Sequence, residues 1–254
     1  MISCNLKGGL GNQLFQISTT FSLAKSNGDD SIFNLDACWT PMQGNKASKY
    51  KDTIFKNLNI STQIVMDSLY TDPTFSYTSI PYSKNLCIDG YFQSEKYFSH
   101  YYNELLNLYD LNYKLVEINE FFDKLPTPIT SVHIRRGDYI PFQNIVVLLD
   151  FEYYKRSMNI LKSNTYLIFS HDFEWAKENF TEKNHVLFEF DDELMNLIAM
   201  SYCDNHIIAN STFSWWGAYL NKSKTKTIVA PNQWFNPESN IPEFDLIPST
   251  WIKI

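Results

Sequence analysis

The sequence predicts an α/β protein with a mostly parallel sheet in the C-terminal half, and its two halves permit two similar domains that face a cleft. From residue 129 onward, short apolar segments alternate with segments of helical periodicity, which is the pattern of βαβ units. The first 36 residues have the same organisation of strand, glycine-rich turn, helix and strand. The proline-flanked segment 125–130 is the natural boundary, so we expect domains of residues 1–128 and 129–254.

The C-terminal half supplies most of the predicted elements. Short apolar runs predict five strands: ITSVHI (129–134), TYLIFS (165–170), HVLF (185–188), HIIAN (206–210) and TIVAP (227–231). Apolar residues at helical spacing predict four helices: 151–162, 173–180, 192–203 and 212–221. Ligands of parallel sheets bind outside the carboxyl ends of the strands, so the residues that follow these strands are the first candidates for a site.

The N-terminal half is readable only at its beginning. MISCNL predicts a strand, GGLGNQ (8–13) a turn, and the following residues a helix that stops at Gly28. SIFNLD (31–36) predicts a second strand. Residues 37–85 show no clear periodicity, and we predict no element there.

Composition excludes several classes of protein. The formal net charge of −7 argues against a nucleic-acid-binding face, because phosphate contacts need a basic surface. The four cysteines are scattered, which favours free thiols in a reducing compartment over a disulfide framework. The chain has no apolar run of membrane-spanning length, and its N-terminus lacks a basic leader and an apolar core. We therefore expect a cytoplasmic protein.

The stretch SVHIRRGDYI (131–140) carries the strongest chemical signal. Arg135 and Arg136 are two of only three arginines in the chain, and they follow a predicted buried strand. Strand alternation places His133 and Arg135 on one face and Arg136 on the other. One arginine can therefore reach a ligand, where its fork of donors matches a phosphate, while the other pairs with a carboxylate such as Asp138. The alternative is a structural Arg–Asp pair at the end of a strand.

The glycine-rich turn is a second candidate anion site. Its residues are Gly9, Leu10, Gly11 and Asn12. Backbone N–H groups at the start of a helix can face an anion, although the turn lacks the GK[ST] of a P-loop. Gly9 and Gly11 also begin a dinucleotide fingerprint, with Asp36 as the ribose-binding acid, so an NAD(P)-dependent oxidoreductase is an alternative; however, Leu14 stands where the third glycine belongs. The simplest alternative is a tight turn that uses glycine for positive φ.

Two further strand ends carry polar residues. Asn210, Ser211, Thr212 and Ser214 lie at a strand-to-helix turn, with Ser211 as the expected N-cap, and offer hydroxyls and free amides to an anion. Asp172 follows another strand and can accept hydrogen bonds from a ribose or a base edge, cap the next helix, or do both.

The sequence contains no recognisable metal motif. There is no D-x-D, no HExxH, no GxSxG and no Cys/His cluster. We therefore expect no metal and no cofactor, and a bound diphosphate has to be neutralised by arginine, lysine and backbone dipoles.

Five sequence blocks together resemble one known family. They are GGLGNQLFQ (8–16), GYFQSEKYF (90–98), HIRRGDY (133–139), FSHDFEWAKENF (169–180) and NSTFSWWGAYLN (210–221). In this order they are similar to the signature blocks of glycosyltransferase family 11, the α-1,2-fucosyltransferases. The resemblance implies a GT-B fold of two Rossmann-like domains, the N-terminal one on the acceptor side and the C-terminal one binding GDP-fucose. It also implies an inverting, metal-independent transfer of L-fucose from GDP-β-L-fucose to the 2-OH of a β-galactoside acceptor.

The resemblance also assigns roles to residues. By analogy with fucosyltransferases that share the HxRRxD block, Arg135 engages the donor phosphates, and His133 and Asp172 contact the guanosine. Ser211, Thr212 and Ser214 contact phosphate, and the turn 9–12 lies across the cleft. The candidate bases for the acceptor hydroxyl are Asp138, His133 or a departing phosphate oxygen; pairing with Arg136 would lower the pKa of Asp138 and make it a poorer base.

This sequence departs from the family pattern at two places. His171 stands where the family usually has a first acid after FS, and the loop PFQNIVVLL (141–149) is unusually apolar. The implied partners are GDP-fucose and a galactose-containing acceptor glycan, with no nucleic acid. The implied setting is bacterial surface-glycan or O-antigen synthesis, which leaves open a peripheral association with the inner membrane through a lipid-linked acceptor. A non-catalytic sugar- or nucleotide-binding protein remains the other alternative.

Overall fold

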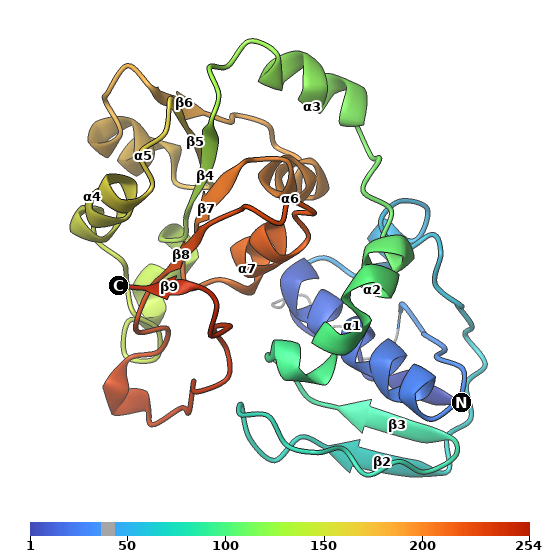
Figure 1. The fold of residues 1–254 in the computed structure, drawn as a ribbon. Helices are drawn as coiled ribbons and strands as arrows, with labels where there is room; N and C mark the ends of the chain where they lie inside the picture. The colour runs from blue at the N-terminus through green and yellow to red at the C-terminus, as the bar shows by residue number, and fades with distance from the viewer. Residues whose placement is uncertain (37–43) are drawn as a thin grey trace. The chain divides into compact units, whose positions relative to one another are not determined.

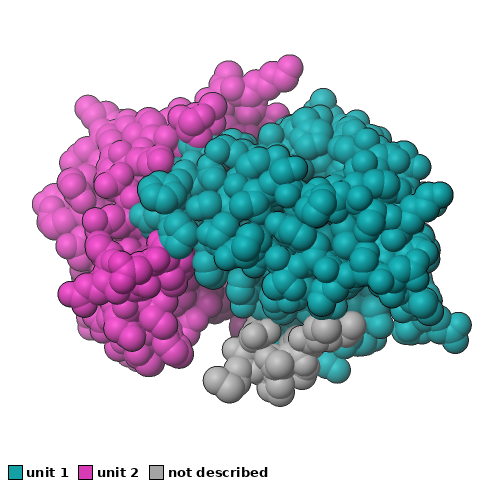
Figure 2. Space-filling model, turned by 90° about the horizontal axis from the view of Figure 1, so that it is seen from below, with its two compact units in different colours: residues 1–111, 242–248 teal, residues 112–241, 249–254 magenta. Residues whose placement is uncertain are grey.

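The computed structural model describes residues 1–36 and 44–254, and these form two compact units. Unit 1 comprises Met1–Leu111 and Pro242–Pro248, and unit 2 comprises Asn112–Ile241 and Ser249–Ile254 (Figure 2). The division at 111/112 comes earlier in the chain than the expected boundary at 128/129. The segment 242–248 also returns to unit 1 from within the predicted C-terminal domain.

Tertiary contacts explain both differences. Helix α3 (Leu115–Phe122) precedes the proline-rich segment, yet its Phe121 ring packs edge-on against Phe188 of unit 2, with the ring centroids 5.1 Å apart. In the returning segment, Asp245 forms an ion pair with Lys96 and accepts a hydrogen bond from the backbone N–H of Tyr77 at 2.9 Å. The partner of a helix or a short loop is a long-range choice, which local composition does not encode.

Unit 2 contains a six-stranded, entirely parallel sheet. Its strands are β4 (Ile129–Ile134), β5 (Thr165–Ser170), β6 (His185–Leu187), β7 (Asn205–Ile207), β8 (Ile228–Ala230) and β9 (Ile252–Lys253). The spatial order is β6-β5-β4-β7-β8-β9, which in order of appearance is 3-2-1-4-5-6. This is the classical order of the dinucleotide-binding fold, and it places the topological switch point between β4 and β7. The predicted parallel sheet of the C-terminal half is confirmed, and β9 is an addition that the sequence did not predict.

Helices cover both faces of this sheet. They are α4 (Phe151–Ile160), α5 (Phe173–Asn179), α6 (Glu193–Ser201) and α7 (Thr212–Tyr219). Figure 1 shows α4 and α5 on one side of the strands and α6 and α7 on the other. Because both faces are covered, every residue of β4 and β5 is buried, as their continuous apolar sequences require.

Three of these helices begin with the same device. The side chains of Asp150, Asp172 and Asp192 accept hydrogen bonds from the backbone N–H three residues later, at 3.0, 3.2 and 3.0 Å. An N-cap aspartate satisfies one of the free donors of the first turn and also complements the helix dipole. The caps explain why these helices start where the sequence pattern indicated.

Unit 1 is built on a three-stranded parallel sheet of order β1-β3-β2. Its main elements are β1 (Ile2–Cys4), α1 (Leu10–Ser26), β2 (Ser68–Thr71) and β3 (Leu86–Asp89), followed by the short 3₁₀ helices η3 (Glu95–Tyr97) and η4 (Ser99–Tyr101) and helix α2 (Tyr102–Leu108). The predicted first strand and helix are confirmed. Strand β2 lies in the stretch where no element was predicted, and its largely exposed side chains explain the missing signal.

The predicted second strand over 31–36 is wrong. Ser31 and Phe33 form only isolated bridges, to Ile2 and Ile60. The side chain of Asn34 accepts a hydrogen bond from the backbone N–H of Asp36 at 3.1 Å, which turns the chain away from an extended ladder. Alternating apolar residues were therefore a misleading guide here.

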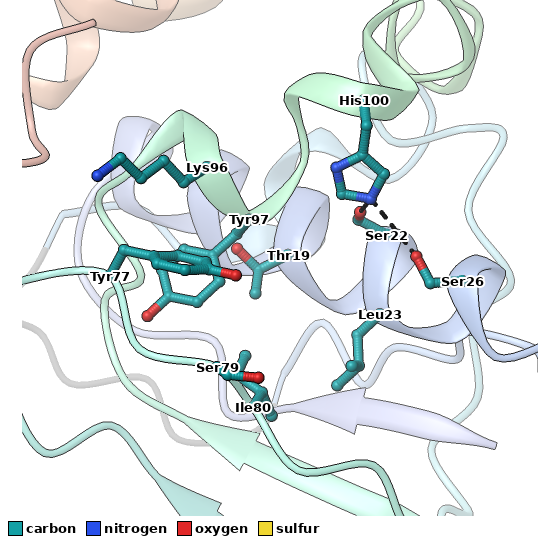
Figure 3. A pocket seen from close by; sticks show the side chains of 10 residues that line it. All are labelled: Thr19, Ser22, Leu23, Ser26, Tyr77, Ser79, Ile80, Lys96, Tyr97 and His100. Atoms are coloured by element: carbon teal, nitrogen blue, oxygen red, sulfur yellow. Dashed lines mark hydrogen bonds between the residues drawn. The ribbon is translucent and has the colours of Figure 1, made fainter.

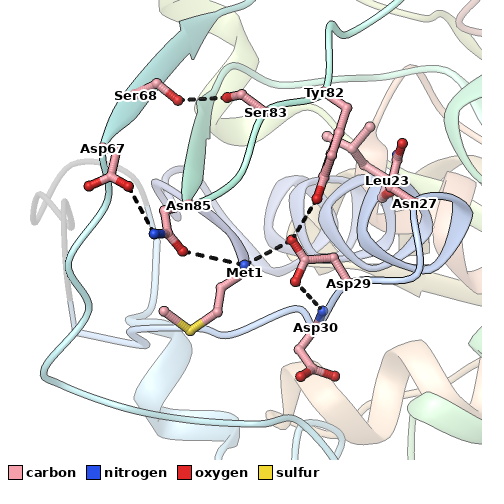
Figure 4. Close-up of polar contacts among 10 residues, drawn as sticks. All are labelled: Met1, Leu23, Asn27, Asp29, Asp30, Asp67, Ser68, Tyr82, Ser83 and Asn85. Carbon is pink, nitrogen blue, oxygen red and sulfur yellow. Dashed lines mark hydrogen bonds and ion pairs between the residues drawn. The ribbon is translucent and has the colours of Figure 1, made fainter.

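Polar contacts connect the start of β1 to the end of α1 and to the start of β3 (Figure 4). The amino group of Met1 lies 2.8 Å from Asp29 after α1 and 3.5 Å from the Asn85 side chain before β3. The amide of Asn85 in turn donates to Asp67 at 2.8 Å. Hydrogen bonds from the Met1 amino group and from the N–H of Asp30 lower the pKa of Asp29.

Over residues 1–36 and 44–254, no helix combines the length and apolarity that crossing a membrane requires.

Candidate active site

The candidate site of unit 2 forms where β4 and β7 end, at the switch point of the sheet. After β4 the chain enters the 3₁₀ helix η5 (Gly137–Phe142), and after β7 it turns into α7. The two turns touch: the hydroxyl of Tyr139 donates to the backbone carbonyl of Asn210 at 3.0 Å, and the rings of His133 and Phe213 lie 5.6 Å apart. The structure thus brings together two motifs that lie more than 70 residues apart in the chain.

Arg135 lies at the centre of the β4 turn. One of its terminal nitrogens lies 2.6 Å from Oδ2 of Asp138, and its guanidinium lies over the ring of Tyr139 at 5.3 Å from the centroid. Its Nε is buried and has no hydrogen-bond partner among the described residues. With 30% of the side chain exposed, the guanidinium is both partly accessible and not fully bonded, which suits a group that receives an anionic ligand.

Arg136 has a different environment. Its guanidinium donates to the carbonyl of Leu149 at 2.7 Å and lies 4.4 Å from the centroid of the Trp175 ring. The expectation that the two arginines diverge is confirmed, but their expected partners are reversed. Asp138 pairs with Arg135, and Arg136 binds a carbonyl and an aromatic face. The reason is that β4 ends at Ile134, so strand alternation no longer governs the directions of the two side chains.

His133 is the buried member of the block. Its side chain is 3% exposed, and its Nδ1 has no hydrogen-bond partner among the described residues. Burial, together with the charges of Arg135 and His171, holds the pKa of His133 well below its usual value. The imidazole is therefore neutral at neutral pH and can offer a hydrogen bond to an uncharged group of a ligand.

Asn210 fastens the β7–α7 turn to the rest of unit 2. Its side-chain nitrogen donates to the carbonyls of Val147 and Trp234 at 2.7 and 2.9 Å, and the residue is fully buried. Its Oδ1 has no partner among the described residues. The side-chain nitrogen of Asn210 therefore links the loops that contain Val147 and Trp234, and only the side-chain oxygen is available to a ligand.

The hydroxyl residues after Asn210 differ in their availability. Ser211 is the N-cap residue of α7, as expected, but its side chain makes no capping hydrogen bond. Thr212 is the first helical residue and is partly exposed. Ser214 is buried, and its hydroxyl turns back to the carbonyls of Ser211 and Ala209 at 3.2 and 3.4 Å. The hydroxyl of Ser211 is hydrogen-bonded to Tyr139, so the start of α7 offers the partly exposed hydroxyl of Thr212 and the N–H groups of its first turn, which is a favourable setting for a phosphate.

Asp172 follows the neighbouring strand β5. One of its carboxylate oxygens caps α5 by accepting from the N–H of Trp175, and its own N–H donates to the hydroxyl of Ser170 at 2.9 Å. The capping alternative is thus confirmed. The side chain is only partly buried, so its second oxygen can still serve a ligand. His171 beside it is exposed.

The glycine-rich turn belongs to unit 1, where it starts α1. Gly8 has a φ of +79°, and a Cβ at this position would lie 2.3 Å from the Asn12 side chain. Leu10 and Gly11 are buried, so these two residues can offer only backbone groups to a ligand. The Asn12 side chain accepts from Gln93 at 2.9 Å. Asp36, the acid of the dinucleotide alternative, instead accepts from the hydroxyl of Ser48 at 2.7 Å.

Two residues of the site were missed by sequence reasoning. Tyr139 places its ring beside Arg135 and its hydroxyl on the β7–α7 turn, while Trp175 supports Arg136. Burial raises the pKa of Tyr139, which keeps it as a neutral donor. The only signal was an aromatic residue adjoining each charged motif, and the high aromatic content of the chain masked it.

The arrangement combines a partly free guanidinium, a helix N-terminus with the partly exposed Thr212 and a neutral buried imidazole at one switch point. Such a set can bind a phosphate or diphosphate and stabilise negative charge on it. Among residues 1–36 and 44–254, no group of three or more His, Cys, Asp or Glu side chains is placed to hold a metal ion.

Comparison with known proteins identifies relatives over the whole chain. An alpha-1,2-colitosyltransferase from Escherichia coli is 31% identical over 290 aligned residues, which cover 100% of this chain and 99% of the relative. The O-antigen biosynthesis glycosyltransferase WbnK from Escherichia coli is 26% identical, with 100% of both chains covered. A galactoside 2-alpha-L-fucosyltransferase from Caenorhabditis elegans is 26% identical over 100% of this chain and 79% of its own.

Solved structures show the same fold at much lower identity. The fucosyltransferase NodZ from Bradyrhizobium matches with a TM-score of 0.55 at 9% identity, covering 85% of this chain and 90% of its own. POFUT1 in complex with GDP matches with a TM-score of 0.53 at 11% identity, covering 90% and 96%. These neighbours have the GT-B fold, which confirms the predicted fold class.

The model of the family described as glycosyl transferase family 11 matches residues 1–254. The predicted resemblance is confirmed, and the dehydrogenase alternative built on Gly9, Gly11 and Asp36 is set aside. The chain belongs to glycosyl transferase family 11 and is a glycosyltransferase.

Proposed function

We propose that the protein transfers L-fucose from GDP-β-L-fucose to the 2-OH of a β-galactoside, with inversion at the anomeric carbon and without a metal ion. The observation that carries this proposal is the position of the Arg135 guanidinium at the switch point. Its Nε has no partner among the described residues, and it lies over the ring of Tyr139, whose hydroxyl donates to Asn210 just before α7. A leaving diphosphate needs fixed positive charge and N–H donors, and both are gathered here.

The comparisons support the donor and the linkage. The Caenorhabditis elegans relative is named as a galactoside 2-alpha-L-fucosyltransferase. A NodZ structure soaked with GDP-fucose matches with a TM-score of 0.53 at 10% identity, covering 86% of this chain and 92% of its own. Likeness at this identity supports the fold, and the family membership connects that fold to sugar transfer.

The proposed roles of the residues follow from their positions. Arg135 binds the β-phosphate, and Ser211 and Thr212 bind phosphate together with the N–H groups at the start of α7. Ser214, whose hydroxyl is turned to the backbone, supports this turn in the described state and reaches phosphate only after rotating. His133 and the second oxygen of Asp172 contact the guanosine.

The chemistry that Arg135 performs is charge stabilisation. Displacement at the anomeric carbon builds positive charge on the sugar and negative charge on the departing GDP. A donor aimed at the departing phosphate lowers the barrier, because it binds the transition state more strongly than the ground state. Removing one such donor costs about 3–4 kcal/mol, or roughly a hundredfold or more in rate.

The acceptor hydroxyl must also lose its proton. Asp138 remains a candidate base because 57% of its side chain is exposed, although its Oδ2 is held by Arg135 at 2.6 Å and pairing with an arginine makes a carboxylate a poorer base. His133 is the weaker candidate, because its lowered pKa makes it a poor proton acceptor. A departing phosphate oxygen is the third.

A second donor is favoured by one observation. The relative with 31% identity is named as a colitosyltransferase, and colitose differs from L-fucose only in lacking the 3-hydroxyl. A site that uses GDP-colitose therefore shares the phosphate and guanosine contacts and differs only around the sugar. The WbnK name supports an O-antigen acceptor, and a cytoplasmic location beside a lipid-linked acceptor fits such a role.

The deciding experiment incubates the purified protein with GDP-fucose or GDP-colitose and a panel of galactosides, with and without EDTA. We expect transfer from GDP-fucose, an α-1,2 linkage by NMR, and no effect of EDTA. Transfer only from GDP-colitose would change the assigned donor. GDP binding without any transfer would make the protein a non-catalytic binding protein, and restoration of lost activity by a divalent ion would overturn the role given to Arg135.

A further inference from the structure

Unit 1 contains a cavity of about 150 Å³ that belongs to none of the motifs described above (Figure 3). Its walls come from the second half of α1, from the segment 77–80 and from the 3₁₀ helices η3 and η4. A water molecule occupies roughly 30 Å³, so the cavity volume is larger than a few water molecules need. It is smaller than the ~300 Å³ of pockets that bind drug-sized ligands. The volume suits a single sugar ring rather than a nucleotide.

One wall is a pair of tyrosines. The rings of Tyr77 and Tyr97 lie 4.8 Å apart with an interplanar angle of 54°, and Figure 3 shows them together on one side of the cavity. Tyr97 is buried, whereas 41% of Tyr77 is exposed. An exposed aromatic face at the edge of a cavity can pack against the C–H face of a sugar ring.

This wall is held in place by contacts within unit 1. Asp245 accepts from the N–H of Tyr77 and forms an ion pair with Lys96, and the N–H of Thr78 donates to the hydroxyl of Tyr97 at 3.0 Å. The ion pair offsets the charge of Lys96, so the cavity is close to neutral. A charged ligand gains little from such a lining, and a neutral one loses nothing.

Helix α1 adds hydroxyl groups to the lining of the cavity. Thr19 is 1% exposed, lines the cavity, and its Oγ1 has no hydrogen-bond partner among the described residues. The adjacent Thr20 behaves differently, since its hydroxyl donates to the carbonyl of Gln16 at 2.7 Å. A buried hydroxyl that lines a cavity and lacks the usual helix bond is available to a water molecule or a ligand in that cavity.

A histidine extends this polar wall. The Nε2 of His100 lies 3.1 and 3.4 Å from the hydroxyls of Ser22 and Ser26, and all three side chains line the cavity. These contacts hold the side chains of η4 and α1 together. Each hydroxyl keeps further capacity to donate or accept, as recognition of a polyol requires.

We propose that this cavity binds one neutral pyranose ring, stacked on Tyr77 and hydrogen-bonded to Thr19. The identification of that ring as a non-reacting sugar of the acceptor glycan rests on the proposed function. The cavity is then a specificity subsite, separate from the donor contacts of unit 2.

The test measures binding of lactose, glucuronate and glucosamine to the full-length protein by saturation-transfer NMR and calorimetry, without a donor. Tyr77→Ala removes the stacking face, and Thr19→Val replaces the unpartnered hydroxyl by a methyl group of similar size. Tyr202→Ala is the matched control, because Tyr202 is 45% exposed and lies in unit 2. We expect both cavity variants to weaken lactose binding at least tenfold, the control to leave it unchanged, and the charged sugars to bind more weakly than lactose.

Equal lactose affinity in all variants, no detectable binding, or preference for a charged sugar would overturn the proposal. A kinetic arm separates this result from the proposed function. With GDP-fucose and an oligosaccharide acceptor, Tyr77→Ala should raise the acceptor KM tenfold and leave kcat and the donor KM unchanged. Loss of lactose binding in a protein that transfers no sugar would support the site and contradict the function, whereas transfer with an unchanged acceptor KM would do the reverse.

Discussion

The carboxylate of Asp138 lies 2.6 Å from the guanidinium of Arg135, in the turn that directly follows strand β4. The candidate base and the candidate phosphate ligand are therefore partners in the protein without donor. A phosphate that binds Arg135 either joins this pair or displaces the carboxylate. Under the proposed function, the contacts of Asp138 therefore change when the donor binds.

We expect Arg135→Lys to lower kcat at least a hundredfold while the protein stays folded, because an ammonium group cannot reproduce the fork of donors. Steady-state kinetics with GDP-fucose and circular dichroism check this. Arg156→Lys is the matched control, since Arg156 is the third arginine and its Nε donates only to a carbonyl of its own helix, at 3.4 Å. Near-normal turnover of Arg135→Lys would make Arg135 a structural residue.

Asp138→Asn distinguishes a base from a positioning residue. If Asp138 takes the acceptor proton, kcat falls about a hundredfold or more, and the fall of kcat toward low pH that protonation of the base causes is lost, while GDP affinity is retained. This is the outcome that we expect. A variant with normal kcat but weakened GDP binding would show instead that Asp138 only orients Arg135.

Arg136 should act on stability rather than on catalysis directly. Arg136→Met removes the hydrogen bond to Leu149 and the contact with the Trp175 ring, and we expect a loss of about 2–3 kcal/mol in the free energy of unfolding. Urea denaturation measures it. Trp175→Leu should give a smaller loss, and the double variant should show coupling between the two. Independent effects of the two substitutions would contradict the stacking role.

Two buried histidines make stability depend on pH. Burial lowers the pKa of His133 well below its usual value and that of His206 to about 3, with Arg135 and Lys226 as additional causes. In the unfolded chain both take up a proton as pH falls through about 6.5, whereas in the folded protein they stay neutral. Stability is therefore fully present above this pH and falls below it, by up to about 1.4 kcal/mol per pH unit for each histidine.

Urea denaturation between pH 7.5 and 5.5 tests this, since ordinary carboxylates titrate lower. His206→Asn should reduce the slope of stability against pH and also lower stability at pH 7.5, because it loses the hydrogen bonds to Ser131 and Asn221, both 2.8 Å. His133→Asn should reduce the slope as well. An unchanged slope in both variants would mean that the two histidines take up protons equally readily in the folded and unfolded states, which would contradict their lowered pKa.

Two glycines that flank α1 give a matched pair of substitutions. Gly8 and Gly28 both have positive φ, +79° and +63°, but an added Cβ would collide with Asn12 at Gly8 and meet nothing within 4 Å at Gly28. We expect Gly28→Ala to cost about 1 kcal/mol through backbone strain alone, and Gly8→Ala to cost about 2 kcal/mol or more. Thermal and urea unfolding check the order. Equal costs would show that the turn relaxes around the new side chain.

Some features of the fold were readable from local sequence because their causes are local. The bounds of β4 and β5 agree with the predicted 129–134 and 165–170, since both strands are continuous apolar runs buried on two faces. Asp172 indicated the start of a helix because an aspartate caps a helix through its own side-chain hydrogen bond, as it does here. A strand that faces solvent, such as β2, carries no such pattern and was not predicted.

The sequence predicted most residues of the candidate site but not which of them contact one another. The sequence by itself determined the mostly parallel sheet, the residues that follow its strands, and the family resemblance. Only the tertiary structure decided that Asp138 pairs with Arg135 and not Arg136, and that Tyr139 joins the β4 turn to Asn210. It also decided that 242–248 belongs to unit 1, with Asp245 bound to Lys96. The physical reason is that periodicity and capping act within a few residues, whereas these pairings depend on side-chain directions beyond a strand end and on segments distant in the chain.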